Sequence, residues 1–391
     1  MNSLDVVTEQ RFFKTPDGVY WTDNSYDYSF WCRYLMVYDS VNVVARVRFI
    51  DYVDVGNRIQ VCGNGVSIVD IPYYIGPKDF LKALHKIVPV MFSRRELKQD
   101  AIVRIPGILG FLYYSIVSSS HSNIGAEVVG DPREVFSGKG ILEKLYKMIF
   151  YYSQKLICKK SKFVSYVTKY YLQEIYPCSN AEYTSNYSSI DLKKDDYRFV
   201  KGNCHNKKDS LNIVCIGKLN YNYKGCDFLL SAVNDLKILA PNVKITWIGD
   251  GRLRSEFETL SKNIGVSDIF SFIGNVSEKD IMHRYIDSSD LFLLTSRQEG
   301  LPRVLMEAMA RKKFCISSNV GGASELIDDD YLFEVDNYDE FLSVFERYLN
   351  LSDNEISEVS ERNYTTALKY SQDELNKRRK DFYQSLLSKN I

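Results

Sequence analysis

Three short segments in the second half of the chain combine glycines with charged side chains. They are Gly217-Lys218-Leu219 with the following Lys224-Gly225, then Gly249-Asp250-Gly251, and then the stretch from Ser296 to Ala310. Ammonium groups neutralise phosphates, and a carboxylate accepts hydrogen bonds from two neighbouring hydroxyls, as on a ribose or hexose. Lys218 and Lys224 with Glu299 and Glu307 therefore predict a site for a sugar that carries phosphate.

The third segment also predicts its own local structure. Pro302 suits the first position of a helix, where its missing N–H costs nothing. The loop Glu299-Gly300-Leu301 before it can direct free backbone N–H groups and the helix dipole at a phosphate or at sugar hydroxyls. Glu299 and Glu307 are eight residues apart, so they can meet different parts of one elongated ligand. Lys218 and Lys224 can stabilise the charge on a departing diphosphate.

The elements around these segments alternate between strand and helix. We expect strands at 211–219, 244–250, 269–276, 291–296 and 314–319, with helices at 224–240, 252–264, 278–286 and 302–311. Strands that are apolar on both faces indicate a parallel sheet covered by helices on both sides. Ligands of such a doubly wound domain bind at the carboxyl ends of the strands, where all three segments lie.

The first half is less regular. Strand candidates are 41–47, 65–71, 101–106, 125–131, 163–168 and 181–186, with amphipathic helices at 81–97 and 141–159. A second doubly wound domain fits this pattern. The polar stretch 188–210 is the best linker, so we predict domains at 1–200 and 201–370. A polar amphipathic helix follows within 371–391.

Composition narrows the class of protein. The chain has 391 residues, with 50 Lys or Arg and 50 Asp or Glu, a balance that suggests no nucleic-acid partner. The eight cysteines form no C-x-x-C pair and no zinc-like cluster, which favours reduced thiols. The N-terminus lacks a signal-peptide pattern and the longest apolar run is short of a bilayer span. We expect a cytoplasmic protein.

Residues 211–327 resemble the donor-binding domain of glycosyltransferase family 4. The family pattern G-R-L, K-G, G-x-G, S-x-x-E-G-x-P-x-x-x-x-E-A-x-A, G-G and E is matched in order and spacing by Gly217–Leu219, Lys224-Gly225, Gly249–Gly251, Ser296–Ala310, Gly321-Gly322 and Glu325. The resemblance implies the GT-B architecture, with two doubly wound parallel-sheet domains facing a central cleft. The second domain would hold the nucleotide sugar and the first would bind the acceptor. The helix within 371–391 would pack back on the first domain.

The resemblance also implies a retaining transfer without metal or further cofactor, with the nucleotide sugar as co-substrate. Glu299 would bind the hydroxyls of the donor sugar, Glu307 the ribose, and Lys218 and Lys224 the diphosphate. The expected donor-binding set is completed by Gly217, Gly249, Asp250, Gly251, Gly300, Leu301, Pro302 and Glu325. Lys218 departs from the family, which usually has Arg there. Lysine keeps the charge but loses the two-pronged guanidinium geometry.

The first half resembles the family only weakly. Many members carry a His at a strand end facing the donor sugar, whereas the comparable position here reads Gly130-Asp131. Asp131 is therefore our candidate catalytic residue on this side, with Arg133 beside it. Arg11, Arg46 and Arg104 are further candidates for facing the cleft.

Several of these residues have a plainer interpretation. Asp250 between two glycines can be a tight turn instead of a nucleotide contact, and Glu325 can cap a helix instead of recognising the base. Residues 81–170 hold 15 Lys or Arg against 6 Asp or Glu. The helices within 80–98 and 141–160 can therefore dock on an anionic membrane. They can also be core-facing helices with ordinary outer lysines.

The sequence thus predicts a hexosyltransferase-type enzyme of bacterial surface polysaccharide biosynthesis, such as capsule, O-antigen or exopolysaccharide. Its acceptor would be a saccharide, lipid-linked if the enzyme works at the inner face of the cell membrane. The rival hypotheses are a nucleotide-sugar epimerase or a phosphorylase on the same fold, and a non-catalytic subunit that binds nucleotide sugar. Transfer of sugar to an acceptor with release of nucleotide separates these classes.

Overall fold

The chain folds into two compact units. The computed structural model describes residues 2–53, 58–119, 123–135, 140–198 and 210–387. Unit 1 comprises Met1–Tyr187 with Asn376–Ile391, and unit 2 comprises Ser188–Leu375. The division after Tyr187 precedes the predicted boundary at 200 because Ile190 and Leu192 are buried. Ser371 also pairs with Leu192, in a β-bridge within unit 2. Most of the linker predicted at 188–210 lies outside the described residues.

Unit 1 carries the less regular half of the sequence. Its elements are β1 (Ser3–Lys14), β2 (Tyr20–Thr22), α1 (Tyr28–Trp31), η1 (Tyr34–Met36), β3 (Ser40–Phe49), β4 (Ile59–Gln60), β5 (Val66–Pro72), α2 (Gly76–Glu96), β6 (Asp100–Ile105), α3 (Ile108–Val117), β7 (Ile124–Val128), α4 (Pro132–Val135), α5 (Ile141–Lys160), β8 (Phe163–Tyr166), α6 (Tyr171–Ile175) and β9 (Tyr183–Asn186). The six strands predicted in this half are present, as are the helices at 81–97 and 141–159.

The sheet of unit 1 is parallel through the order β5-β3-β1-β6-β7-β8-β9, and the short strands β2 and β4 add an antiparallel edge. The strand order reverses at β1 and β6, whose residues Leu4 to Val7 pair with Asp100 to Val103. The sequence analysis did not predict β1, although it is central and most of its first half is buried. Its apolar pair Val6-Val7 is flanked by polar residues on both sides, so the sequence shows no apolar run long enough to predict a strand.

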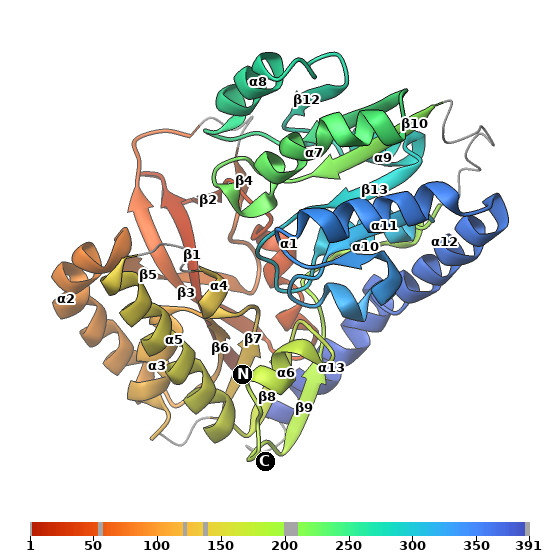
Figure 1. Cartoon of the computed structure of the whole chain (residues 1–391). Coiled ribbons are helices and arrows are strands. Elements are labelled where there is room, and N and C mark those ends of the chain that lie inside the picture. Colours follow the sequence, from red (N-terminus) through yellow and green to blue (C-terminus); the bar gives the residue numbers. More distant parts are fainter. Residues whose placement is uncertain (1, 54–57, 120–122, 136–139, 199–209, 388–391) are drawn as a thin grey trace. The chain divides into compact units, whose positions relative to one another are not determined.

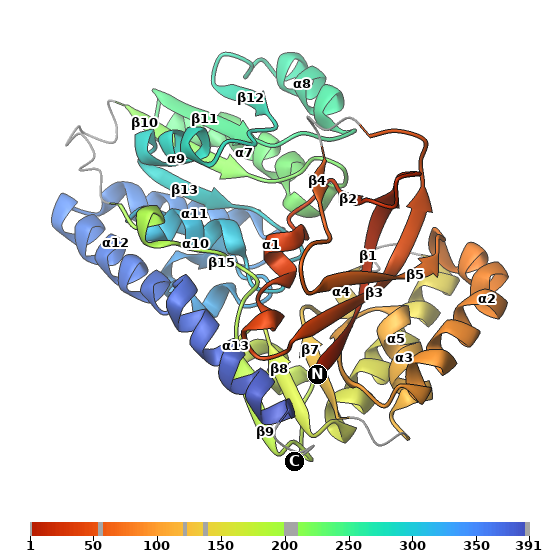
Figure 2. The ribbon, with the colours of Figure 1, turned by 180° about the vertical axis from the view of Figure 1, so that it is seen from behind.

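Helices cover both faces of this sheet. In Figure 1, α2, α3 and α5 lie side by side, and α3 contacts both of its neighbours. Figure 2 shows α13 (Gln372–Leu387) beside β8 and β9. Phe382 on α13 is fully buried against the rings of Tyr183 and Tyr187. The part of α13 from Asn376 onward therefore belongs to the core of unit 1.

Unit 2 carries the regular alternation read from the sequence. Its elements are η2 (Lys194–Asp196), β10 (Leu211–Ile216), η3 (Asn222–Lys224), α7 (Cys226–Leu239), β11 (Val243–Ile248), α8 (Arg254–Asn263), β12 (Phe270–Gly274), α9 (Lys279–Ser288), β13 (Leu291–Leu294), α10 (Arg303–Ala310), β14 (Phe314–Ser318), η4 (Ala323–Glu325), η5 (Asp329–Tyr331), β15 (Leu332–Phe333), α11 (Tyr338–Asn350) and α12 (Asp353–Leu368). Each predicted strand and helix between 211 and 319 is present, with ends that differ by a few residues.

The sheet of unit 2 is parallel, in the order β12-β11-β10-β13-β14-β15. From β10 the chain adds β11 and then β12 on one side, and it then returns to add β13, β14 and β15 on the other side. The strand order therefore reverses between β10 and β13. Right-handed crossovers then place α7 and α8 on one face and α9 and α10 on the other. This confirms the α/β class and the doubly wound parallel sheets. It also fixes the place where a ligand should bind, at the carboxyl ends of β10 and β13.

Candidate functional site in unit 2

The loops that follow β10 and β13 converge at this reversal point. Strands β10 and β13 are hydrogen-bonded neighbours, with Ile213 opposite Leu291. The connection after β10 carries Lys218 and Lys224, and the connection after β13 carries Glu299. Two of the three predicted segments therefore meet through the topology of the sheet, although they are far apart in the chain.

Lys224 and Glu299 form an ion pair in this site. The distance from Lys224 Nζ to Glu299 Oε1 is 2.5 Å, and the two side chains are only 16% and 14% exposed. Ser296 Oγ donates to the same oxygen at 2.8 Å. Among the described residues, no donor reaches Glu299 Oε2. The carboxylate is thus fixed through one oxygen, and the other can accept from the hydroxyls of a ligand.

The backbone around Lys224 is tied to the end of β13. Thr295 Oγ1 lies 3.1 Å from the carbonyl oxygens of both Lys224 and Gly225. The N–H of Arg297 donates to the carbonyl of Tyr223 at 2.7 Å. These bonds hold the short helix η3 against the neighbouring connection. Lys224 is therefore placed by the backbone and not by its side-chain partner alone.

Arg297 is a residue that the sequence analysis missed. Its guanidinium donates to the carbonyl of Asn222 at 2.7 Å and forms ion pairs with Asp227 at 2.7 Å and Asp336 at 2.8 Å. It thereby links the loops after β10 and β13 to the start of α11. The signal that could have found it is its position directly after Ser296, inside the matched segment. We interpret Arg297 as a residue that positions the Lys224 loop.

Two glycines allow these loops to approach so closely. Gly225 has a φ of +71°, and a Cβ there would lie 1.9 Å from the carbonyl oxygen of Thr295. Gly321 has a φ of +54°, and a Cβ there would lie 2.1 Å from the carbonyl oxygen of Glu299. The N–H of the next residue, Gly322, donates to the carbonyl of Gly300 at 2.8 Å. The Gly-Gly pair is thus the support on which the Glu299 loop rests.

Lys218 and the Gly249–Gly251 turn lie on the other side of the β10 loop. Lys218 is exposed and, among the described residues, has no ion-pair partner. A Cβ on Gly217 would lie 2.9 Å from Lys224 Cγ, and a Cβ on Gly249 would lie 2.1 Å from the carbonyl oxygen of Gly217. Gly251 packs in the same way against Leu219, since its Cβ would lie 2.3 Å from that carbonyl carbon. The glycines of both motifs therefore let the two loops and the Lys224 stem stack in contact.

Asp250 already has partners that suit a tight turn. It accepts from the N–H of Gly251 at 2.7 Å, and its other oxygen lies 3.2 Å from Arg254. Half of its side chain remains exposed. The turn interpretation thus has direct support in the structure, and contact with a nucleotide stays a prediction.

The helix α10 presents Glu307. The helix begins at Arg303, so Pro302 is its N-cap and not its first helical residue as predicted. Leu301 and Pro302 are buried and anchor the loop. Glu307 is half-buried and, among the described residues, no donor contacts its carboxylate. Desolvation raises its pKa, while the cations Arg303 and Lys279 oppose that rise. A carboxylate held in this state is suited to accept from ligand hydroxyls.

Glu325 lies in the short helix η4, just after the glycines that support the Glu299 loop, and is half-buried. Helix capping and recognition of a base both remain predictions for this residue. Across the described ranges of the chain, no group of three or more His, Cys, Asp or Glu side chains is arranged to hold a metal ion.

Asp131, the candidate from the first half, is fully engaged inside unit 1. It is 2% exposed and accepts from Tyr176 Oη at 2.7 Å and from the Arg133 backbone N–H at 2.8 Å. The Arg133 guanidinium also forms an ion pair with it at 2.6 Å. With both oxygens occupied, this arrangement favours a structural role over the predicted catalytic one. Arg104 is likewise buried and paired with Glu127.

Comparison with known proteins agrees with this geometry. Residues 210–350 match the family model described as glycosyl transferases group 1. The protein CapJ of Staphylococcus aureus is 26% identical over 317 residues, which cover 80% of this chain and 79% of CapJ. Sucrose-phosphate synthase of Thermosynechococcus elongatus aligns with a TM-score of 0.71 and 13% identity over 100% of both chains. Anabaena HepE in complex with UDP aligns with a TM-score of 0.64 and 14% identity over 99% of this chain and 100% of HepE.

Two doubly wound parallel-sheet units, together with the likeness to these solved structures, define the GT-B fold. Within that fold, residues 210–350 form the part of the chain that matches the group 1 glycosyltransferases. The resemblance to family 4 read from the sequence agrees with this assignment.

Proposed function

We propose that the chain transfers a sugar from a nucleotide-sugar donor to a saccharide acceptor with retention of the anomeric configuration. The observation that carries this proposal is the Lys224–Glu299 pair at the carboxyl ends of β10 and β13. A cation and a carboxylate held side by side match the two halves of such a donor, its diphosphate and its sugar.

The residues of unit 2 would divide the work. Lys224, helped by the exposed Lys218, would neutralise the negative charge that develops on the departing diphosphate, which is often the largest catalytic contribution. The free oxygen of Glu299 would accept from sugar hydroxyls, and Glu307 would accept from the ribose. The resemblance to family 4 supports a transfer without metal and an acceptor from a bacterial surface polysaccharide.

Thermal-shift measurements against a panel of nucleotides and nucleotide sugars test the donor site. We expect at least one nucleotide to stabilise the wild type, and Lys224→Ala and Glu307→Ala to lose most of that stabilisation. Lys237→Ala, an exposed lysine on α7, is the matched control and should respond like the wild type. If no nucleotide stabilises the wild type, or if both site variants respond unchanged, the assignment is wrong.

Analysis of the reaction product tests both the retention of configuration and the class of reaction. With the donor identified, NMR of the anomeric proton should show the same configuration in donor and product at the earliest time points. An inverted product would exclude retention. Interconversion of the donor sugar without transfer would indicate an epimerase, sugar phosphate formed from free phosphate would indicate a phosphorylase, and binding without turnover would indicate a non-catalytic subunit.

We further propose that unit 1 docks on the anionic inner face of the cell membrane. The helix α5 exposes Leu145, Met148, Ile149, Tyr152 and Leu156, each between 44% and 61% exposed. Their spacing of three and four residues puts them on one helical face, which we call the α5 stripe. Lys144, Lys147, Lys155 and Lys159 lie on the same helix. Apolar residues on an outward face, among lysines, are typical of an interfacial helix.

The second helix, α2, contributes less to such a surface. Leu81, Phe92 and Leu97 at its end are exposed, but Arg94 is occupied by an ion pair with the buried Asp5. In the part of the chain that the structure describes, no helix combines the length and apolarity needed to span a bilayer. Liposome flotation with and without anionic lipid tests the proposal. Flotation should require anionic lipid and should be lost in the double variant Ile149→Asp/Leu156→Asp. Flotation that depends neither on anionic lipid nor on these two residues would exclude membrane docking through α5.

A further inference from the structure

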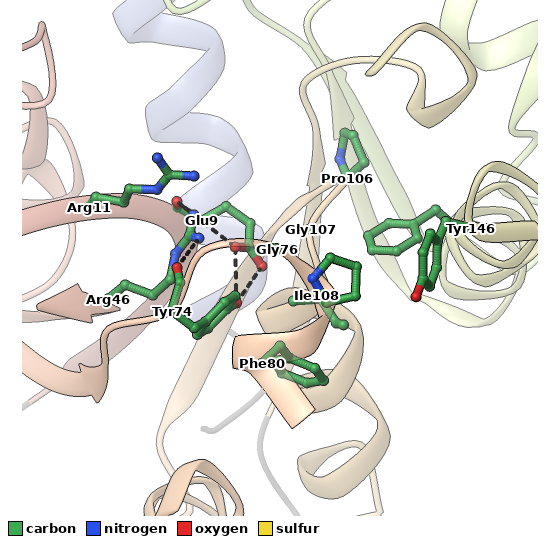
Figure 3. Close-up of a pocket in the computed structure, with 12 residues that line it drawn as sticks. Glu9, Arg11, Arg46, Tyr74, Gly76, Phe80, Pro106, Gly107, Ile108 and Tyr146 are labelled. Carbon is green, nitrogen blue, oxygen red and sulfur yellow. Dashed lines mark hydrogen bonds and ion pairs between the residues drawn. The ribbon is translucent and has the colours of Figure 1, made fainter. Parts of the chain in front are cut away.

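A cavity of about 330 Å³ lies in unit 1 where its strand order reverses (Figure 3). Glu9 of β1 and Gly107, two residues beyond the end of β6, line it, and these two strands are the neighbours at the reversal. The helices α2 and α3 both begin at this cavity, at Gly76 and Ile108. Positive helix ends at the carboxyl edge of a parallel sheet are suited to bind an anion.

Glu9 is the acidic group in the cavity, and neighbouring donors already balance the negative charge of its carboxylate. Figure 3 shows its carboxylate between Tyr74 and Arg46. It accepts from the N–H of Leu109 at 2.6 Å and from Tyr74 Oη at 3.2 Å, and it forms an ion pair with Arg46 at 3.1 Å. With three kinds of donor around it, Glu9 shapes the cavity and does not repel an incoming anion.

Two arginines, Arg11 and Arg46, line the cavity together with this single carboxylate. Arg46 is only 6% exposed, and its Nη1 donates to the carbonyl of Tyr74 at 3.2 Å. Its Nε is buried without a hydrogen-bond partner among the described residues. Arg11 also lines the cavity, is exposed, and has no ion-pair partner within the described ranges. The cavity thus holds a surplus positive charge and a buried donor that lacks an acceptor.

The remaining wall is apolar. It consists of Phe80, Pro106, Ile108, Tyr146 and Phe150. Tyr146 and Phe150 lie in the first half of α5, each directly after a member of the exposed α5 stripe, Leu145 and Ile149. The apolar wall therefore adjoins an apolar surface that leads away along α5. A free inorganic anion would use neither feature, and a neutral sugar would not need the surplus cations.

We propose that this cavity binds the phosphate or diphosphate of a long-chain alcohol ester, with Arg11 and Arg46 on the anion and the hydrocarbon chain along the α5 stripe. The inference rests on the proposed function, in which unit 1 takes the acceptor. It gives that acceptor a chemical class, a saccharide anchored through phosphate to a lipid.

Calorimetric titration of the full chain with farnesyl phosphate, below its micelle concentration, tests the proposal. Farnesol and inorganic phosphate supply the chain and the anion separately, and both should bind much more weakly. Arg11→Ala should weaken binding of farnesyl phosphate roughly tenfold or more, because it removes charge-assisted hydrogen bonds. Ile149→Ser should weaken it severalfold. Both positions are exposed, so these variants should fold.

Arg48→Ala is the matched control, since Arg48 is an exposed arginine two residues beyond Arg46 on β3 and does not line the cavity. Unchanged affinity in Arg11→Ala would overturn the inference. Inorganic phosphate binding as tightly as farnesyl phosphate would overturn the lipid part of it. Arg11→Ala should keep the nucleotide-induced stabilisation of the wild type. A wild type that binds farnesyl phosphate but no nucleotide would therefore refute the proposed function and not the cavity.

Discussion

Lys224 Nζ and Glu299 Oε1 lie 2.5 Å apart, although 75 positions separate the two residues in the chain. The pair exists because β10 and β13 are neighbours in the sheet and because Thr295, which follows β13, holds the backbone at Lys224. Each charge offsets the desolvation of the other, so removing one partner leaves an uncompensated charge in a mostly buried place.

We therefore expect energetic coupling between Lys224 and Glu299. A double-mutant cycle of Lys224→Met and Glu299→Gln, followed by urea denaturation, should give a coupling free energy of about 0.5–3 kcal/mol. The exposed pair Lys162–Glu182, at 3.2 Å with side chains 63% and 36% exposed, is the control. Its coupling should not exceed about 0.5 kcal/mol. Equal coupling in the two pairs would contradict the importance of burial at the site.

Unit 2 could be predicted from the sequence far better than unit 1. Its strands are short apolar runs between glycine-containing loops, and the spacing of Glu299, Pro302 and Glu307 already indicated a loop followed by a helix. The meeting of Lys224 with Glu299 could be expected from strand-end positions in a parallel sheet. For Arg297 the sequence offers only its place inside the matched segment, because its partners Asp227 and Asp336 carry no motif.

Unit 1 was harder for physical reasons. The central strand β1 runs from apolar into charged residues, so it shows neither a continuous apolar run nor clear alternation. Asp131 was selected from its place after a strand, but sequence position does not reveal that Tyr176 would occupy its carboxylate. The cavity around Glu9 combines residues from five elements, β1, β3, α2, α3 and α5, and no local pattern brings those residues together.

Gly225 should tolerate alanine much less well than Gly265. Both glycines have a φ of +71°, but a Cβ on Gly265 meets nothing within 4 Å, whereas a Cβ on Gly225 would lie 1.9 Å from the carbonyl oxygen of Thr295. Gly265→Ala should lower the free energy of unfolding by about 1–2 kcal/mol, the cost of the left-handed conformation alone. Gly225→Ala should cost more and should also reduce nucleotide-induced stabilisation. Similar losses in the two variants, measured by urea denaturation, would show that the close approach to β13 is not needed.

The C-terminal helix should be required for the stability of unit 1. Phe382 is fully buried between α13 and the sheet, so Phe382→Ala should cost about 3–5 kcal/mol. Hydrogen exchange should accelerate in β8 and β9, which α13 covers, and much less in β10 and β11 of unit 2. Leu368→Ala, at a side chain that is 42% exposed, is the control and should have little effect. Unchanged exchange in β8 and β9 would mean that α13 is not part of this core.

Glu307 should destabilise the ligand-free chain at neutral pH. Desolvation raises the pKa of its carboxyl above that of the unfolded chain, so the folded chain binds the proton more tightly. The stability contributed in this way is complete below the unfolded pKa, roughly 4.3, and is lost as the pH rises through the higher folded pKa. Glu307→Gln removes this penalty. Its free energy of unfolding should exceed that of the wild type at pH 7, and the difference should disappear near pH 4.

The same substitution should weaken nucleotide binding, because an amide offers one acceptor oxygen where the carboxylate offers two. Urea denaturation at the two pH values, with and without the stabilising nucleotide, measures both effects on one variant. Glu256→Gln, at an exposed position on α8, is the control and should change neither quantity by more than about 0.5 kcal/mol. Greater stability together with weaker binding would identify Glu307 as a group whose charge is kept for a ligand at a cost to the fold. A Glu307→Gln variant no more stable than the wild type at pH 7 would show that its carboxylate is already satisfied within the protein.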